Sequence, residues 1–393
     1  MDKPIQGPAV PRPLNWFMWA SATVLGVVLI LLDLMQLDGL RLSKARLIVG
    51  RDFLNVWTGG NLALSGQLDK LYDYDAYRTW QMAIFGVLDP YNYSYPPQSL
   101  FLAMPFAELP YLPALILWTV AGATFFMWAA KPYMASLPNW LAIATPAAVV
   151  NIWCGHYGFV IGALWLLFFR SLNRAPIRSG VIAGLMTLKP HLGLLIAATL
   201  IYRRKGKVIG FAIIVTLALI LLSSFAFGFD LWRQWIVETS ALQNRIMNAS
   251  GNKFYFLMMP SAYIALREYP AMIAVIVQIG FATVAIWLTW RARNADIQQF
   301  AFICATATAI ILPYIFNYDL TVVSLGFAIL LYDRWTSLTL GERIILWLAF
   351  ASPLLVMVYN LIAPIALLAG LIVLVKHAIG SHETTPARTF AKA

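Results

Sequence analysis

The chain has 393 residues, of which 61% are hydrophobic and 11% charged, against about 45–50% apolar and about 25% charged residues in soluble domains. This composition excludes a soluble enzyme and predicts an all-α, polytopic helical membrane protein. The formal net charge of +11 would suit a nucleic-acid-binding protein, but in a membrane protein basic residues first report topology, and we expect no nucleic-acid partner.

Apolar runs along the chain predict about 12 transmembrane or re-entrant helices. The first run follows Lys3 and Arg12 and is too long for the apolar region of a signal peptide, so we expect it to stay as a membrane anchor. Several other runs are shorter than the about 20 residues that cross a bilayer. In chain order, the runs lie at about 15–36, 112–130, 139–153, 157–170, 179–188, 190–202, 208–227, 269–290, 298–316, 319–332, 344–358 and 361–376.

The two runs at 179–188 and 190–202 predict a re-entrant hairpin. Basic residues flank both of its ends, which places both ends on the cytoplasmic side. Lys189-Pro190 interrupts the apolar sequence between the runs, so we expect two short helices whose apex points toward the outer face. Non-helical backbone at such a depth is tolerated only inside protein or beside a wet cavity.

The distribution of Lys and Arg predicts a multi-pass protein of the inner (cytoplasmic) membrane with both termini in the cytoplasm. Residues 1–376 then form one integral membrane domain, and residues 377–393 form a disordered cytoplasmic tail. Two outer loops are long, the first at 37–111 and the second at 228–268. Helices along the outer surface are expected from Ser99 to Leu109 and from Asp230 to Ala241, and shorter outer segments at about 154–157, 188–191 and 317–319.

This topology rests on basic residues alone, yet it brings most of the unusual polar side chains to the outer face. We therefore expect an outward-facing functional site. No His, Asp or Glu spacing in the chain resembles a metal site. The polar residues on the outer face are Asp52, Tyr95, His156, Tyr157, Lys189, His191, Asp230, Arg245, Lys253 and Asp319.

Asp52 is the carboxylate of most interest, and two interpretations of it remain open. It stands between Arg51 and Phe53 shortly after the first predicted span. It would form an interfacial salt bridge or cap the N-terminus of a helix containing Val56 to Leu64. Alternatively, it acts as a general base, which needs a carboxylate within hydrogen-bond reach of an acceptor hydroxyl.

Lys189 and His191 lie at the apex of the predicted hairpin, where an ionisable side chain is costly unless it is paired or hydrated. Lys189 suits an anionic partner such as a phosphate. The alternative is a lysine that snorkels or caps a helix. His191 and His156 would otherwise serve as interfacial hydrogen-bonding residues.

The remaining candidates also have two interpretations each. Asp319 begins a predicted span, where a helix N-terminus stabilises a carboxylate without any catalytic task. Arg245 and Lys253 lie in the second long outer loop and would meet a phosphate or a lipid headgroup, or simply be solvated.

With these residues laid out, the chain resembles glycosyltransferase family 87, whose members are membrane enzymes of the GT-C type that use polyprenyl-phosphate sugars. The resemblance runs over most of the chain and rests on the order and spacing of short motifs. These motifs are Arg51-Asp52-Phe53, Leu71-Tyr72-Asp73, Tyr95-Pro96-Pro97, Met104-Pro105-Phe106, Gly155-His156-Tyr157-Gly158, Leu188-Lys189-Pro190, Phe227-Gly228 before Trp232, and Met259-Pro260-Ser261.

The resemblance implies a GT-C-like fold and an inverting hexosyltransferase with Asp52 as its catalytic base. The implied donor is a polyprenyl-phosphate hexose, with mannose as the first choice, and the implied acceptor is a lipid or glycan reached among membrane lipids. We expect no cofactor or metal, because basic side chains can neutralise the departing phosphate. Many family members carry a histidine-rich motif where this chain has Tyr314 to Asp319, with Asn317-Tyr318-Asp319 and no histidine. Residues expected to bind donor phosphate or substrate are Lys189, His191, His156, Tyr95, Arg245, Lys253 and Asp319.

The main alternative from another class is a polytopic transporter or lipid flippase without transferase activity. Transporters often contain repeats and broken helices near the membrane midplane. In this chain the one broken pair is not repeated, and the polar groups gather at one face. A GT-C-fold protein that has lost activity and acts as a scaffold is a third alternative.

Overall fold

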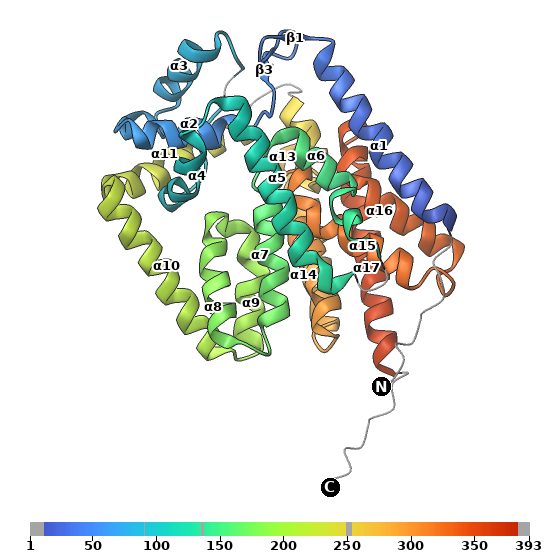
Figure 1. Ribbon diagram of the computed structural model, residues 1–393. Helices are drawn as coiled ribbons and strands as arrows, with labels where there is room; N and C mark the ends of the chain where they lie inside the picture. The colour runs from blue at the N-terminus through green and yellow to red at the C-terminus, as the bar shows by residue number, and fades with distance from the viewer. Residues whose placement is uncertain (1–11, 90, 135–136, 249–253, 384–393) are drawn as a thin grey trace.

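Helices make up most of the computed structural model, which describes residues 12–89, 91–134, 137–248 and 254–383 (Figure 1). The expected helical class is therefore confirmed. One departure is a small antiparallel sheet in the first outer loop, with the strand order β1-β2-β3. Its strands have two residues each: β1 (Leu37–Asp38), β2 (Arg41–Leu42) and β3 (Leu47–Ile48).

The sheet forms because this stretch contains its own turn signal. Asp38 is followed by Gly39, which has a φ of +63° and allows the tight reversal between β1 and β2. Arg46, with a φ of +52°, lies in the second reversal, between β2 and β3. The all-α expectation overlooked this Asp-Gly pair, because strands of two residues have no apolar periodicity to detect.

Five described helices are long and apolar enough to span a membrane, so the chain is a membrane protein. Every predicted apolar run contains a helix, but the expected number of about 12 spans is confirmed only in part. The five are α5 (Tyr111–Ala130), α10 (Gly206–Phe227), α13 (Ala271–Arg291), α16 (Leu340–Val358) and α17 (Ile362–Glu383). Helices in the other runs are α1 (Arg12–Leu34), α6 (Pro146–Cys154), α7 (Gly158–Ser171), α8 (Pro176–Leu185), α9 (Leu194–Tyr202), α14 (Ile297–Ile311) and α15 (Thr321–Asp333).

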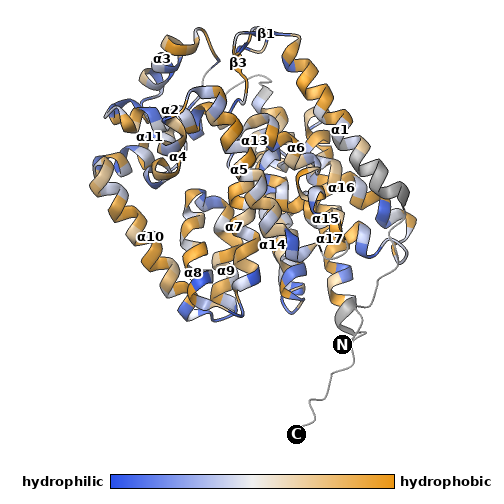
Figure 2. Cartoon of the chain, viewed as in Figure 1, coloured by the Kyte–Doolittle hydropathy of each residue, from blue (hydrophilic) through white to orange (hydrophobic). Residues whose placement is uncertain are grey.

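Burial separates the central helices from the peripheral ones. Nearly all residues of α7, α14 and α15 are buried, so these three helices form the interior of the bundle. In contrast, α10 and α13 expose rows of large apolar side chains, such as Ile214 and Ile276. Figure 2 shows α10 as a largely hydrophobic ribbon at the periphery. Apolar side chains that face outward in this way are suited to contact with lipid.

The two long loops predicted at 37–111 and 228–268 both contain a helix in the stretch where the sequence predicts one. In the first loop, α4 (Leu100–Ala107) lies within the expected stretch from Ser99 to Leu109. In the second loop, α11 (Asp230–Met247) begins where expected and continues six residues beyond Ala241. The further elements at this end are α2 (Phe53–Leu64), α3 (Tyr74–Phe85) and α12 (Ala262–Ala265), with the 3-10 turns η1 (Leu68–Lys70), η2 (Pro97–Ser99) and η7 (Phe254–Met258).

The predicted break at Lys189-Pro190 is present in the structure. Helix α8 ends in the 3-10 turn η5 (Met186–Leu188), and a second 3-10 turn, η6 (Pro190–Gly193), leads into α9. Lys189 lies between the two turns with non-helical backbone angles. Proline removes a backbone donor and disfavours helical geometry in the residue before it, which explains the break.

The C-terminal tail begins later than expected. Helix α17 continues to Glu383, so the prediction of a disordered tail from residue 377 is wrong for its first seven residues. Lys376 and His377 both contact Glu342, at 2.9 and 3.2 Å, and attach this end of α17 to α16. Residues 384–393 lie outside the described part of the chain.

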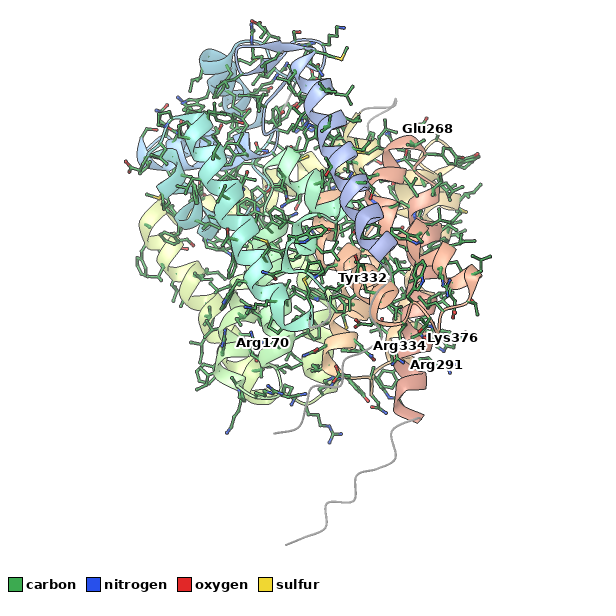
Figure 3. The ribbon with its side chains drawn as sticks, turned by 45° about the vertical axis from the view of Figure 1, so that its right-hand side comes forward. Arg170, Glu268, Arg291, Tyr332, Arg334 and Lys376 are labelled. Carbon is green, nitrogen blue, oxygen red and sulfur yellow. The ribbon has the colours of Figure 1, made fainter. Side chains whose placement is uncertain are left out.

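Basic side chains at one end of the bundle, here called the basic end, predict the orientation of the chain in the membrane. Arg170, Arg291, Arg334 and Lys376 lie at the end opposite α3 and Glu268 (Figure 3). We expect a cysteine replacing exposed Thr79 on α3 to react with a membrane-impermeant maleimide in intact cells. A matched Thr336→Cys variant at the basic end should react only after lysis, and both native cysteines are buried. If only Thr336→Cys were labelled in intact cells, the predicted topology would be wrong and its orientation would be the reverse.

Candidate active site

A tight turn after β3 places Asp52 at the start of α2. Gly50 and Arg51 both have left-handed backbone angles, with φ of +77° and +36°. Such a φ is strained for arginine and persists only where the surroundings enforce it. Asp52 occupies the N-cap position of α2, yet its side chain forms no capping hydrogen bond. Arg51 pairs instead with Asp33, so neither the capping interpretation nor a salt bridge to Arg51 accounts for Asp52.

Glycines allow the segment Gly155-His156-Tyr157-Gly158 to pack directly beside this turn. A Cβ atom on Gly155 would lie 2.6 Å from Cβ of Phe53 and 3.0 Å from the carbonyl oxygen of Gly50. A Cβ on Gly158 would collide with the carbonyl oxygen of Tyr318. The segment therefore lies between the Asp52 turn and the 3-10 turn η8 (Asn317–Leu320), which precedes α15.

A buried ion pair joins the hairpin apex to η8. Lys189 Nζ donates to Asp319 Oδ1 at 2.6 Å, and the two side chains are 8% and 1% exposed. His156 Nδ1 lies 3.7 Å from the same carboxylate oxygen, and its Nε2 is hydrogen-bonded to the Tyr95 hydroxyl at 2.7 Å. The His156 ring also stacks on Tyr318, with 3.9 Å between ring centroids. Four segments far apart in sequence thus meet at one polar cluster.

The environment of Asp52 favours its protonated form. Burial raises the pKa of this carboxyl from 3.8 to about 7, because a low-dielectric surround disfavours the charged form. The positive charges of Lys189 and Arg51 and a hydrogen bond from Tyr318 lower the pKa, whereas the negative charge of Asp319 raises it. Asp319 is directly paired with Lys189, whereas no ion pair of 4 Å or less joins Asp52 to another described residue. Asp52 is therefore the carboxyl of the cluster without a direct ion pair among the described residues.

His156 is uncharged in this surround. Burial lowers its pKa well below the ordinary 6.5, and the nearby charge of Lys189 and the His191 side chain lower it further. The Tyr95 hydroxyl is therefore hydrogen-bonded to a neutral imidazole. His156 is suited to orienting neighbouring groups rather than to compensating a negative charge.

The structure brings together most of the predicted site residues. Asp52, Tyr95, His156, Lys189 and Asp319 belong to the cluster, and His191 is exposed in η6 next to Lys189.

The other predicted residues lie elsewhere. Arg245 is exposed on α11, where its charge acts on Tyr74, and Asp230 pairs with Arg233 at the start of the same helix. Lys253 lies outside the described residues.

Three residues near the site were not predicted from sequence. Tyr318 stacks on His156, while Asp33 and Trp153 bind Arg51. Asp33 had a detectable signal, because a carboxylate inside a predicted span needs a partner. Trp153 and Tyr318 had none among so many aromatic residues. Within the described residues, no group of three or more His, Cys, Asp or Glu side chains could hold a metal ion.

Comparison with known proteins identifies the class of this chain. The model of glycosyltransferase family 87 matches residues 93–313, which is more than half of the sequence. Together with the spanning helices, this match makes the protein a membrane glycosyltransferase. The chain belongs to glycosyltransferase family 87. Comparisons with curated proteins and with solved structures give no significant match.

The extent of the family match separates two groups of site residues. Tyr95, His156, Lys189 and His191 lie inside the matched range, whereas Asp52 and Asp319 lie outside it. An assignment of Asp52 therefore rests on its geometry and electrostatics. The alternative of a transporter or flippase is not supported, because the family is one of transferases.

The Lys189–Asp319 pair predicts a double-mutant result. Lys189→Met leaves a buried carboxylate unpaired and should destabilise the protein by about 3–5 kcal/mol. Lys189→Met combined with Asp319→Asn should recover most of that loss, because no uncompensated charge remains. Thermal unfolding in detergent measures both. The exposed Arg233–Asp230 pair is the matched control, where Arg233→Met should cause a much smaller loss of stability, because solvent screens exposed charges. Equal losses in the single and double variants would contradict the coupling.

Proposed function

We propose that this glycosyltransferase moves a hexose, with mannose as the first candidate, from a polyprenyl-phosphate donor to a lipid or glycan acceptor. The reaction takes place at the outer face of the inner (cytoplasmic) membrane, and Asp52 is the general base. The observation that carries the proposal is Asp52 itself, a carboxyl whose pKa burial raises to about 7, close to the charged Lys189–Asp319 pair. A base poised near the working pH combines a large ionised fraction with useful basicity.

The proposed reaction is one inverting displacement. The acceptor hydroxyl oxygen attacks the anomeric carbon and forms the new glycosidic bond. The bond from that carbon to the phosphate oxygen breaks, and its electron pair leaves with polyprenyl phosphate. Ionised Asp52 accepts the hydroxyl proton. Atoms and charge balance in this step without a covalent intermediate or a redox partner.

Basic residues at the hairpin apex are the proposed phosphate-binding groups. Lys189 is held by Asp319 at 2.6 Å, so an incoming donor phosphate would compete with Asp319 for the ammonium group. His191 is exposed next to it and is available as a second contact. Arg245 and Lys253, in the second outer loop, remain proposed contacts of the donor or of lipid headgroups. Because the positive charges of Lys189, Arg245 and Lys253 can stabilise the leaving phosphate, we propose no cofactor.

The membrane setting suits a lipid-linked donor. The exposed apolar side chains of α10 and α13 offer a surface on which a polyprenyl chain can lie. Figure 2 shows that α10 approaches the polar end of the molecule near α11 and α4. A donor lying along this helix would present its phosphate toward the outer end, where the hairpin apex is located.

The proposal predicts that Asp52→Asn abolishes transfer. Purified protein incubated with polyprenyl-phosphate hexoses and a membrane lipid extract should yield glycosylated lipids detectable by mass spectrometry. Loss of the base should lower turnover by about 10²–10⁴-fold. Asp69→Asn, an exposed carboxylate change in the same outer loop, is the matched control and should retain activity. Near-normal turnover by Asp52→Asn would remove Asp52 from this role.

The raised pKa predicts how activity and stability depend on pH. Because the ionised form is the base, kcat/KM should rise through about pH 7 and level off above it. The same shift means that ionising Asp52 costs stability as the pH rises from about 4 to about 7. Asp52→Asn should therefore melt at the same or a higher temperature than the native protein at pH 8. A flat rate profile between pH 5 and pH 8 would contradict the assignment.

A further inference from the structure

The Arg51 side chain is held by two residues that are distant in sequence. Its guanidinium donates to both carboxylate oxygens of Asp33, at 2.7 and 2.9 Å. It also lies 3.4 Å from the centre of the Trp153 ring, and Trp153 Nε1 donates to Asp33 Oδ2 at 2.9 Å. We refer to Asp33, Trp153 and Arg51 as the arginine clamp. It joins α1, α6 and the turn that carries Asp52.

The clamp pairs the positive charge of Arg51 with Asp33 and not with Asp52, which follows Arg51 in the sequence. Arg51 immediately precedes Asp52, and its charge lowers the pKa of that carboxyl. The Arg51 guanidinium is nevertheless paired with Asp33, and within the described residues no ion pair of 4 Å or less joins it to Asp52. Bidentate bonds to a carboxylate fix both the position and the orientation of a guanidinium.

We propose that Asp33 is a positioning residue of the active site, which with Trp153 holds the Arg51 guanidinium away from Asp52 so that Asp52 can accept the acceptor's proton. This inference rests on the proposed role of Asp52 as base. Without the Asp33 carboxylate, the acidic residue nearest to Arg51 in the sequence is Asp52. An ion pair between Arg51 and Asp52 would occupy the carboxylate oxygens that the substrate hydroxyl needs.

The groups around Asp52 determine the direction of the expected change. Its charged neighbours are Arg51, Lys189 on the hairpin apex and Asp319 in η8. The cluster also contains the His156 imidazole, whose uncharged form burial favours. The remaining titratable neighbours are phenols and a thiol, which are uncharged near pH 7 at their ordinary pKa values. These are Tyr91, Tyr95, Tyr111, Cys154, Tyr314 and Tyr318. Releasing Arg51 therefore adds positive charge at Asp52 that no other ionised neighbour offsets.

A pH–rate profile tests the proposal, measured as kcat/KM with polyprenyl-phosphate mannose as the donor. Asp33→Asn should move the acidic limb down by about one pH unit and lower kcat about tenfold, because a freed Arg51 pairs with the base. Asp33→Asn combined with Arg51→Met should move the limb back to or above the native position. Asp33→Glu, which restores a carboxylate, should keep the native limb. A purely structural clamp would lower activity in the single and double variants alike and leave the limb in place.

Matched controls separate this inference from its premise. Asp38→Asn removes another carboxylate of the same loop that pairs with an arginine, Arg41, and should leave the profile unchanged. If Asp33→Asn fails to fold, Trp153→Phe removes the hydrogen bond to Asp33 and should give a smaller downward shift. An unchanged limb in the folded variant overturns the positioning role. If Asp52→Asn remains active, the proposed function fails first. If Asp52→Asn is inactive while the limb of Asp33→Asn does not move, only the positioning role fails.

Discussion

The ion pair between Lys189 and Asp319 is the interaction on which the arrangement of the candidate active site depends. A charge in a water-poor interior is costly unless an opposite charge and hydrogen bonds compensate it. Here the ammonium group at a hairpin apex and the carboxylate ahead of α15 compensate each other at 2.6 Å. Because neither side chain is stable there alone, the pair fixes the depth of the hairpin relative to α15. It also places a positive charge near Asp52.

Close backbone packing brings the other segments to this pair. Gly155 and Gly158 let the His156 segment pass between the Asp52 turn and η8 at distances that a side chain would forbid. The aromatic rings of Tyr318 and Tyr95 then hold His156 from two sides. The turn at Gly50 and Arg51 is held from outside by the arginine clamp. The site is thus assembled by packing and charge.

This arrangement gives the two carboxylates different properties. Asp319 is directly paired with Lys189, whereas Asp52 has no ion pair of 4 Å or less among the described residues, and burial raises its pKa. Burial without a close partner raises a carboxyl pKa, and this is how a protein brings a carboxylate toward neutral pH. In the function proposed for this family 87 glycosyltransferase, transfer to a hydroxyl needs a base, and Asp52 would serve as that base. The clamp around Arg51 would then keep the guanidinium away from the proposed base.

The sequence alone determined the membrane class, the helical runs and the break at Lys189-Pro190, and it predicted that the polar residues share one face. These follow from local properties, namely apolar length, proline chemistry and the placement of basic side chains. It also singled out Asp52 and Lys189, because ionisable residues near an apolar segment need a reason. It did not predict the small sheet, which depends on the turn between β1 and β2. It also did not predict the helical continuation of α17 beyond residue 376, which depends on contacts with Glu342.

Only the tertiary structure decided which polar residues meet. Lys189 with Asp319, Tyr95 with His156 and Arg51 with Asp33 are pairs separated by 130, 61 and 18 positions, and no local pattern specifies a partner at such separations.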